Sequence, residues 1–214
     1  MTPAARRSIL LRGVNVLLDV GANRGQYAQW IRTLGYSERI VSFEPTSEAF
    51  GWLAKAAAGD PMWQCHNLAL GADDSDLDLR VSRDSCSTSA FAPTGITLRN
   101  YPDAATIARE RVAMRRLGSL WNDLHCTAPI YLKVDAEGSE LAVLEGAGAV
   151  LDQIAFLELE LSLVPTYVGA PLIGEILRFV EDRGFATVAL EGIQGDDHST
   201  GQMLMLNGIF RNIT

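Results

Sequence analysis

Segments with the apolar pattern of buried strands alternate with segments of helical spacing along almost the whole chain. This alternation constrains the fold more than any other feature of the sequence. The last two strand-like segments follow each other without a helix, so the pattern predicts an α/β fold with a doubly wound, mostly parallel sheet and one antiparallel edge strand. The strand-like segments are 15–20, 39–44, 62–65, 77–81, 130–135, 154–161, 185–191 and 202–210, and the helical ones are 27–34, 47–58 (with Ser47 as N-cap), 139–151 and 172–183.

The 214 residues are expected to form one domain over 15–214, preceded by an N-terminal extension over 1–14. The formal charge of −8 and the pI near 4.9 argue against broad binding to nucleic acid or anionic membranes. Arginines nevertheless cluster in two places, which we expect to be solvated helix faces. The clusters are Arg6, Arg7 and Arg12, and Arg109, Arg111, Arg115 and Arg116.

Cysteine and histidine usage indicates neither disulfides nor a structural zinc site. The three cysteines are an odd number without CxxC spacing, and no signal segment leads the chain, so a cytoplasmic location is expected. No apolar run approaches the roughly 18 residues of a membrane helix, so no integral membrane segment is expected. The sequence does not indicate an oligomeric state.

The stretch "LLDVGANRGQ" over 17–26 has the form of a strand, a glycine turn and the start of a helix. A dinucleotide fingerprint would have glycine at 21, 23 and 26, whereas this chain has Gly21, Asn23 and Gln26. An NAD-dependent oxidoreductase is therefore disfavoured. A small zwitterionic nucleoside fits the turn better, with the Asn23 amide contacting a carboxylate or holding the turn.

Acidic residues stand where two of the expected strands end. Glu44 lies 25 residues after Asp19, a position from which a carboxylate can accept the hydroxyl protons of a ribose, unless it only meets water. Asp19 itself either binds a cationic amine, directly or through water, or caps the glycine turn.

The order of the motifs resembles the FkbM family of S-adenosylmethionine-dependent methyltransferases over about 16–185. The resemblance implies a seven-stranded Rossmann-like methyltransferase fold and, commonly, O-methylation of sugars, polyketides or glycolipids. The expected partner is therefore a small-molecule, sugar or glycolipid acceptor and not nucleic acid. The motifs are "LDVGANRGQYA", "FEP", "NLALG", "LKVDAEGSELAVLEGA" and "LELELSLVPTYVGAPL".

Carried over residue by residue, the resemblance implies a cofactor site for S-adenosyl-L-methionine. It implies that Asp135 faces the methyl group and the acceptor. The remaining residues are Asp19, Gly21, Asn23 and Gly25 around the methionine part, Glu44 at the ribose, and Asn67 and Ala69 beside the adenine. One departure is Trp121, which stands where relatives often have the Asp of a Ser-Leu-Asp run, and it keeps open a catalytically silent binding or scaffold protein on the same fold.

A hydroxyl acceptor needs a group that takes its proton, and the candidates are Asp135, Glu137, Glu160 and His66. The same three carboxylates could instead hold a divalent cation, although no metal is predicted. Glu158 and Glu160 share one face of their strand, and two buried acids are costly without partners, so at least one is expected to be functional.

Two aromatic residues are candidates for binding the acceptor. Tyr167 follows the 154–161 strand and either lines an acceptor pocket or simply packs. Phe91 lies in the long polar stretch 82–102, which is either a lid over the acceptor or a flexible connection. The four tryptophans, Trp30 among them, are expected in the core or at interfaces.

Overall fold

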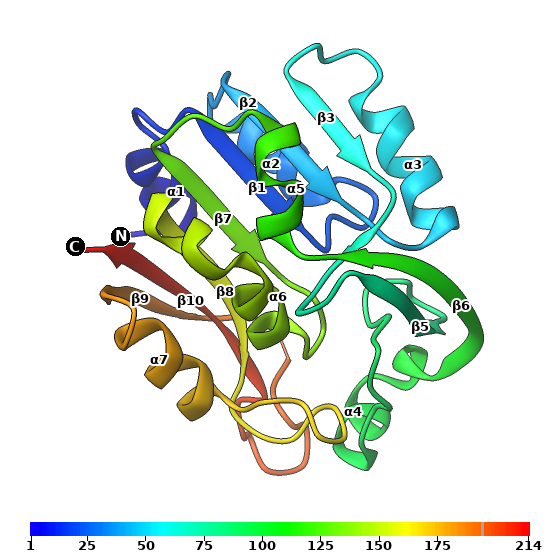
Figure 1. Ribbon diagram of the computed structural model, residues 1–214. Helices are drawn as coiled ribbons and strands as arrows, with labels where there is room; N and C mark the ends of the chain where they lie inside the picture. Colours follow the sequence, from blue (N-terminus) through cyan, green and yellow to red (C-terminus); the bar gives the residue numbers. More distant parts are fainter. Residues whose placement is uncertain (194) are drawn as a thin grey trace.

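The computed structural model describes residues 1–193 and 195–214 and has a central seven-stranded sheet (Figure 1). The strand order is β3-β2-β1-β7-β8-β10-β9, and every neighbouring pair is parallel except the two that involve β10. The seven-stranded, mostly parallel sheet is thus confirmed. Its strands are β1 (Val16–Val20), β2 (Arg39–Phe43), β3 (Trp63–His66), β7 (Ile130–Val134), β8 (Ile154–Ser162), β9 (Phe185–Gly192) and β10 (Met205–Asn212).

The antiparallel strand does not lie at the edge. β10 pairs antiparallel with both β8 and β9, so it lies one place inside the sheet and β9 forms the edge. A chain that turns back directly after β9 must pair antiparallel with it. The sequence pattern indicates that reversal but not the side of β9 on which β10 lies.

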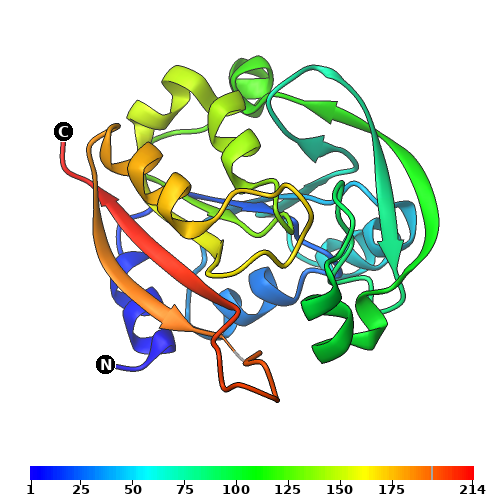
Figure 2. The ribbon, with the colours of Figure 1, turned by 90° about the horizontal axis from the view of Figure 1, so that it is seen from below.

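Helices cover both faces of the sheet (Figure 2). One face packs against α1 (Pro3–Leu10), α2 (Gln26–Thr33) and α3 (Ser47–Ala57), and buries Leu17, Ile40 and Tyr131. The other packs against α5 (Leu117–Leu124), α6 (Glu140–Ala147) with the 3₁₀ segment η2 (Gly148–Gln153), and α7 (Ile173–Glu181). Adjacent residues of the central strands are buried on opposite faces, which is why their sequences are continuously apolar.

A smaller sheet with the order β4-β6-β5 lies beside the main sheet. Its strands are β4 (Ala69–Leu70), β5 (Ser75–Ser82) and β6 (Thr106–Arg115), and α4 (Gly95–Asn100) and η1 (Pro102–Ala104) connect β5 to β6. The helix expected around Arg109, Arg111 and Arg115 is therefore wrong, because these residues lie on β6. Leu79 and Val112 bury the inner face of this sheet. The strand expected over 77–81 is confirmed within β5, whereas β6 was not expected.

Two further expectations need correction. The N-cap of α3 is Thr46, and Ser47 is the first helical residue. The helix predicted over 139–151 ends at Ala147 and continues as η2, because Gly148 adopts a φ of +54°. Among helices of the described residues, none is long and apolar enough to cross a membrane.

The N-terminal extension contains α1, which packs against the sheet through a buried arginine. Arg7, expected on a solvated helix face, is only 2% exposed. Its guanidinium forms a bidentate ion pair with Glu158 on β8 and a further ion pair with Glu191 on β9. The hydroxyls of Tyr27 and Tyr131 donate to the same Glu158 Oε2 at 2.6 and 2.7 Å. The buried Glu158 carboxylate therefore has its ion-pair and hydrogen-bond partners within the fold.

We predict that Arg7→Ala lowers the free energy of unfolding by about 3–5 kcal/mol, because it leaves the buried Glu158 carboxylate without its cation. Urea denaturation measures this change. Arg12→Ala is the matched control, since Arg12 is exposed just after the same helix, and its effect should stay within about 0.5 kcal/mol. Equal losses in the two variants would contradict the assignment.

Candidate functional site

A cavity of about 500 Å³ opens at the carboxyl ends of β1, β2, β7 and β8, which is the place where doubly wound sheets bind ligands. The volume lies within the range of small-molecule sites. Polar residues from the strand ends line one part, and Leu68, Leu70, Leu77 and Leu79 line an apolar part that includes the smaller sheet.

The turn after β1 is shaped by close packing. Gly21 has a φ of +73°, and a Cβ at this position would overlap the carbonyl oxygen of Asp135. Gly25, with a φ of +86°, packs against the Trp63 ring and Leu53. Gly21 therefore lines the cavity, whereas Gly25 is not among its described lining residues and packs behind the turn.

Asn23 connects the turn to Glu44. Its backbone N–H donates to Glu44 Oε2 at 2.9 Å, and its own φ is +48°. Its side-chain amide donates to Ser85 Oγ at 3.3 Å. The amide thus holds the turn against the 82–102 segment, which is one of the two roles expected for it.

Glu44 is 6% exposed and lines the cavity. Oε1 accepts from the Thr46 N–H at 2.8 Å and from Thr46 Oγ1 at 2.6 Å. Burial raises the pKa of Glu44, although these hydrogen bonds counteract the shift. The carboxylate is therefore held in one orientation at the end of β2.

Asn67 and Ala69 follow β3 and have different environments. The Asn67 amide donates to the carbonyls of Glu44 and Pro45, both at 2.9 Å, so it holds the turn after β2. Ala69 lines the cavity next to Leu68 and Leu70. Of the two residues predicted beside the adenine, Ala69 lines the cavity and Asn67 stabilises the neighbouring turn.

Asp19 is completely buried, and its cationic partner is a side chain of this protein, Lys133, and not a ligand amine. Lys133 Nζ lies 3.3 Å from Asp19 Oδ1, and Ser42 Oγ donates to Oδ2 at 3.3 Å. Burial raises the pKa of Asp19, while Lys133 lowers it. In the described part of the chain Asp19 does not line the cavity, so the geometry gives no support to direct contact with a bound amine.

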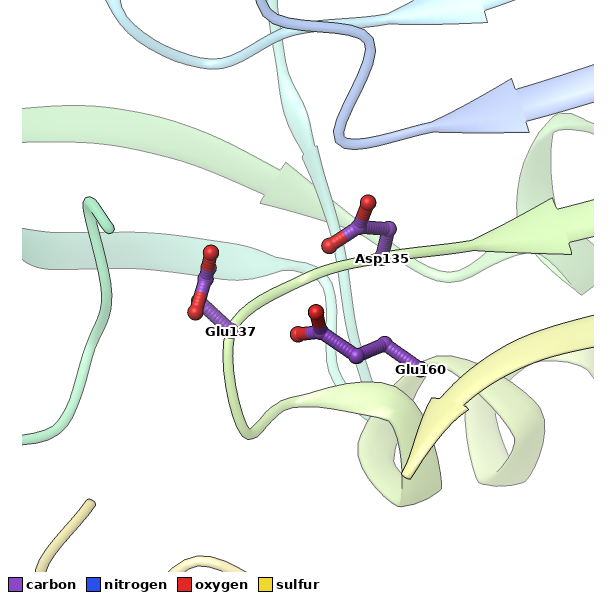
Figure 3. A group of neighbouring side chains, drawn as sticks. All are labelled: Asp135, Glu137 and Glu160. Carbon is purple, nitrogen blue, oxygen red and sulfur yellow. The ribbon is translucent and has the colours of Figure 1, made fainter. Parts of the chain in front are cut away.

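Three carboxylates meet where β7 and β8 end (Figure 3). Asp135 and Glu137 come from the loop after β7 and Glu160 from β8, and each offers an oxygen within 4.8 Å of the others. Burial, and then the charge of Asp135, raise the pKa of both Glu137 and Glu160 well above the usual glutamate range. Glu137 and Glu160 therefore bind a proton more readily than ordinary glutamates, and the oxygens of the group could also hold one divalent cation.

Glu140, at the start of α6, stabilises the loop that carries these acids through backbone hydrogen bonds. Its Oε1 accepts from the N–H groups of Ala136 at 2.8 Å and Gly138 at 3.3 Å. Burial raises the pKa of Glu140 to about 7. Glu137 has a φ of +49°, an unusual value for a residue with a side chain.

Tyr167 and Phe91 support this loop. The Tyr167 hydroxyl donates to Glu137 Oε2 at 2.8 Å, and the residue is 3% exposed. A Cβ on Gly138 would lie 3.3 Å from the Phe91 ring and 3.6 Å from that of Tyr167. Among the described residues neither aromatic ring lines the cavity, so acceptor binding by them stays a prediction.

His66 lies at the end of β3 and stacks on Phe43, with ring centroids 5.2 Å apart. Burial, and then the charge of Arg39, lower its pKa. It is absent from the described lining of the cavity, and the structure does not bring it together with the three carboxylates. Its role as a base therefore has no geometric support.

Several lining residues were missed by the sequence reasoning. Ser85, Cys86 and Thr88 of the 82–102 stretch line the cavity, so part of this stretch borders the site. Ser89 Oγ donates to the carbonyl of Glu137 at 2.6 Å. In the sequence, the sign of a functional segment here was the absence of a strand or helix period over 82–102. Tyr27, Trp30 and Lys133 also line the cavity, although Trp30 was expected in the core.

Trp121, the departure from the family pattern, lies on α5 and packs partly buried against the main core. In the described structure it does not line the cavity. Ser119 Oγ on the same helix donates to Asp74 Oδ2 at 2.6 Å. Trp121 therefore contributes to packing of α5 in the described structure, away from the residues that line the cavity.

Comparison with solved structures finds methyltransferases of low sequence identity. M. capricolum TrmK in complex with S-adenosyl-homocysteine has a TM-score of 0.57 at 6% identity, covering 100% of this chain and 69% of that one. Precorrin-6y C5,15-methyltransferase from Geobacter metallireducens GS-15 has a TM-score of 0.51 at 13% identity, covering 98% and 87%. An rRNA methylase from Streptococcus thermophilus has a TM-score of 0.50 at 11% identity, covering 100% and 98%. These similarities show the fold.

No curated protein matches the chain. The model of the methyltransferase FkbM domain, however, matches residues 19–186, from β1 through the three carboxylates to the start of β9. The resemblance seen in the motifs is thereby confirmed, and the chain belongs to the family of FkbM methyltransferase domains.

Proposed function

We propose that this chain is an S-adenosyl-L-methionine-dependent O-methyltransferase acting on a hydroxyl of a sugar, glycolipid or polyketide-type small molecule. The observation that carries the proposal is the group Asp135, Glu137 and Glu160 at the edge of the cavity. A hydroxyl must lose its proton as it becomes a nucleophile, and carboxylates with raised pKa values suit that task.

The residues present fit the cofactor. The Gly21 turn brings backbone close to the cavity, Glu44 presents a fixed carboxylate at the end of β2, and Ala69 borders the apolar part. TrmK, which has the same fold, was solved with S-adenosyl-homocysteine. When bound, S-adenosylmethionine supplies an electrophilic methyl group on a sulfonium.

The chain's own residues would then orient the acceptor and take its proton. The carboxylate group would take the proton of the acceptor hydroxyl as its oxygen receives the methyl group that the bound cofactor would supply. Positioning contributes much of such a rate acceleration. Glu140 and Tyr167 hold Glu137 in place through the loop and through its carboxylate, so the acids need little rearrangement.

Charge argues for a small acceptor without phosphates. In the described lining, Glu44, Asp135, Glu137 and Glu160 face the cavity together with one cation, Lys133. Such a surface repels phosphodiesters. Although solved proteins of this fold include an rRNA methylase, we therefore propose that nucleic acid is not the acceptor.

The proposal is tested by a transfer screen with methyl-labelled S-adenosylmethionine against glycosides, glycolipids, polyketides and RNA. Label in a hydroxyl of a small molecule is expected. Calorimetry with S-adenosylmethionine and with NADH accompanies the screen. Binding of NADH alone would defeat the proposal, and cofactor binding without transfer to any acceptor would favour a silent binding protein.

We predict that Glu44→Gln weakens binding of S-adenosylhomocysteine roughly 10- to 100-fold, because hydrogen bonds to a charged group contribute about 1.5–3 kcal/mol. Titration calorimetry measures the Kd. Glu48→Gln, on the exposed side of α3, is the control and should bind like the unaltered chain. A Kd within twofold for Glu44→Gln would refute the assignment.

We predict that Asp135→Asn lowers kcat by at least about 100-fold while the Kd of the cofactor changes less than threefold, because general-base catalysis contributes roughly 10²–10⁴-fold. Steady-state rates with the acceptor from the screen and calorimetry give the two values. Asp123→Asn, at an exposed site on α5, controls for loss of charge. Normal turnover in Asp135→Asn would remove this residue from the reaction.

The rate should also depend on pH in a defined direction. A base must be deprotonated, and the pKa values of Glu137 and Glu160 lie well above the ordinary value of about 4.3. The acid limb of kcat against pH should therefore lie above the range of an ordinary glutamate. Asp135→Asn removes one like charge, so the limb of its residual activity should move to lower pH. An unmoved limb would show that these acids do not govern the rate.

A further inference from the structure

The Lys133 ammonium lies between the turn after β1 and the loop after β7, and its side chain is 8% exposed. Nζ is 3.3 Å from Asp19 Oδ1 and 3.4 Å from Asp135 Oδ2. It also donates to the carbonyls of Val20 and Gly21, at 3.5 and 3.4 Å. One cation thus contacts the strand end that leads into the glycine turn and the proposed base.

The ammonium keeps its charge in this position. Burial alone lowers the pKa of a lysine, but the carboxylates of Asp135 and Asp19 outweigh that effect and raise the pKa of Lys133. The Tyr27 ring lies beneath it, with its centroid 5.3 Å from Nζ. Lys133 is therefore a fixed positive charge with partners on two strands, and it differs from the mobile, solvated lysines of a protein surface.

The two segments that it joins are already in direct backbone contact. The N–H of Asp135 donates to the carbonyl of Val20 at 3.1 Å, and Gly21 leaves no space for a Cβ beside the carbonyl of Asp135. Side chains could still rotate above this contact. The Asp135 carboxylate is 40% exposed, and its ion pair with Lys133 restrains it.

We propose that Lys133 is a positioning residue for methyl transfer, which fixes the Asp135 carboxylate relative to the Gly21 turn. The inference rests on the proposed function, because it concerns the distance between the cofactor turn and the proposed base. Lys133 itself need not touch the acceptor. Its effect is exerted through Asp135, and misplacement of a reacting group by about 1 Å can cost roughly 100-fold in rate.

A purely structural role makes a different prediction. Asp19 is completely buried, and Lys133 could serve only to neutralise it. Loss of Lys133 would then matter only while Asp19 is charged. The test therefore compares Asp19→Asn with the double variant Asp19→Asn/Lys133→Met. Neither protein carries the buried Asp19 charge, so neutralisation of Asp19 cannot explain a difference between the two.

The experiment measures melting temperature, the Kd of S-adenosylhomocysteine, kcat and KM for these two variants. We expect similar melting temperatures, Kd values within about threefold, and a kcat at least about tenfold lower in the double variant. The acceptor KM should change less than kcat. Equal kcat values in the two variants would overturn the proposal.

A readout without acceptor accompanies the kinetics. Amide hydrogen exchange around 20–23 and 135–138 should be faster in the double variant than in Asp19→Asn, because the link between the two segments is lost. Unchanged exchange would overturn the proposal. If the unaltered chain transfers methyl to no acceptor, the proposed function fails, and the exchange comparison still decides whether Lys133 joins the segments.

Discussion

The architecture depends on the burial of complementary charges on one face of the central strands. Asp19, Lys133 and Glu158 occupy neighbouring positions across β1, β7 and β8, since Asp19 pairs with Lys133 and Lys133 with Glu158 in the strand registers. Each is almost completely buried. Unpaired charges at these positions would be too costly, so α1 must supply Arg7 and β1 must lie beside β7. Asp135 and Glu160 each lie two residues further along the chain than Lys133 and Glu158, and the ion pair between Lys133 and Asp135 connects this buried row to the cavity.

The sequence predicted the fold wherever a strand or helix carries its own periodic signal. The central strands were found in this way, whereas the Gly21 turn and the carboxylates at 135, 137 and 160 were found from motifs at the strand ends. The strand predicted over 77–81 lies within β5, but its partner β6 was missed, because the charged run over 109–111 interrupts the apolar alternation. The position of β10 was also missed, because strand order depends on contacts between segments far apart in sequence.

Within the site, the sequence indicated which kinds of side chain are present better than it indicated which way each side chain points. Glu44 and Asp135 line the cavity, whereas Asp19 contacts Lys133 and His66 stacks on Phe43. Glu158 and Glu160 share a strand face, yet one is satisfied by Arg7 and two tyrosines and the other lies with the acids of the cavity. No local pattern distinguishes these two glutamates, because their difference arises from α1, 151 residues away from Glu158 in the chain.

The position of β10 between β8 and β9 makes the edge of the sheet dependent on this strand. In the central sheet as described, β9 is hydrogen-bonded to β10, so the edge strand is joined to the other strands through β10. Glu191, which anchors Arg6 and Arg7 of α1, lies on that edge strand. The ion pairs of α1 with Glu191 therefore depend on the pairing of β9 with β10, which connects the first helix to the last strand of the sheet.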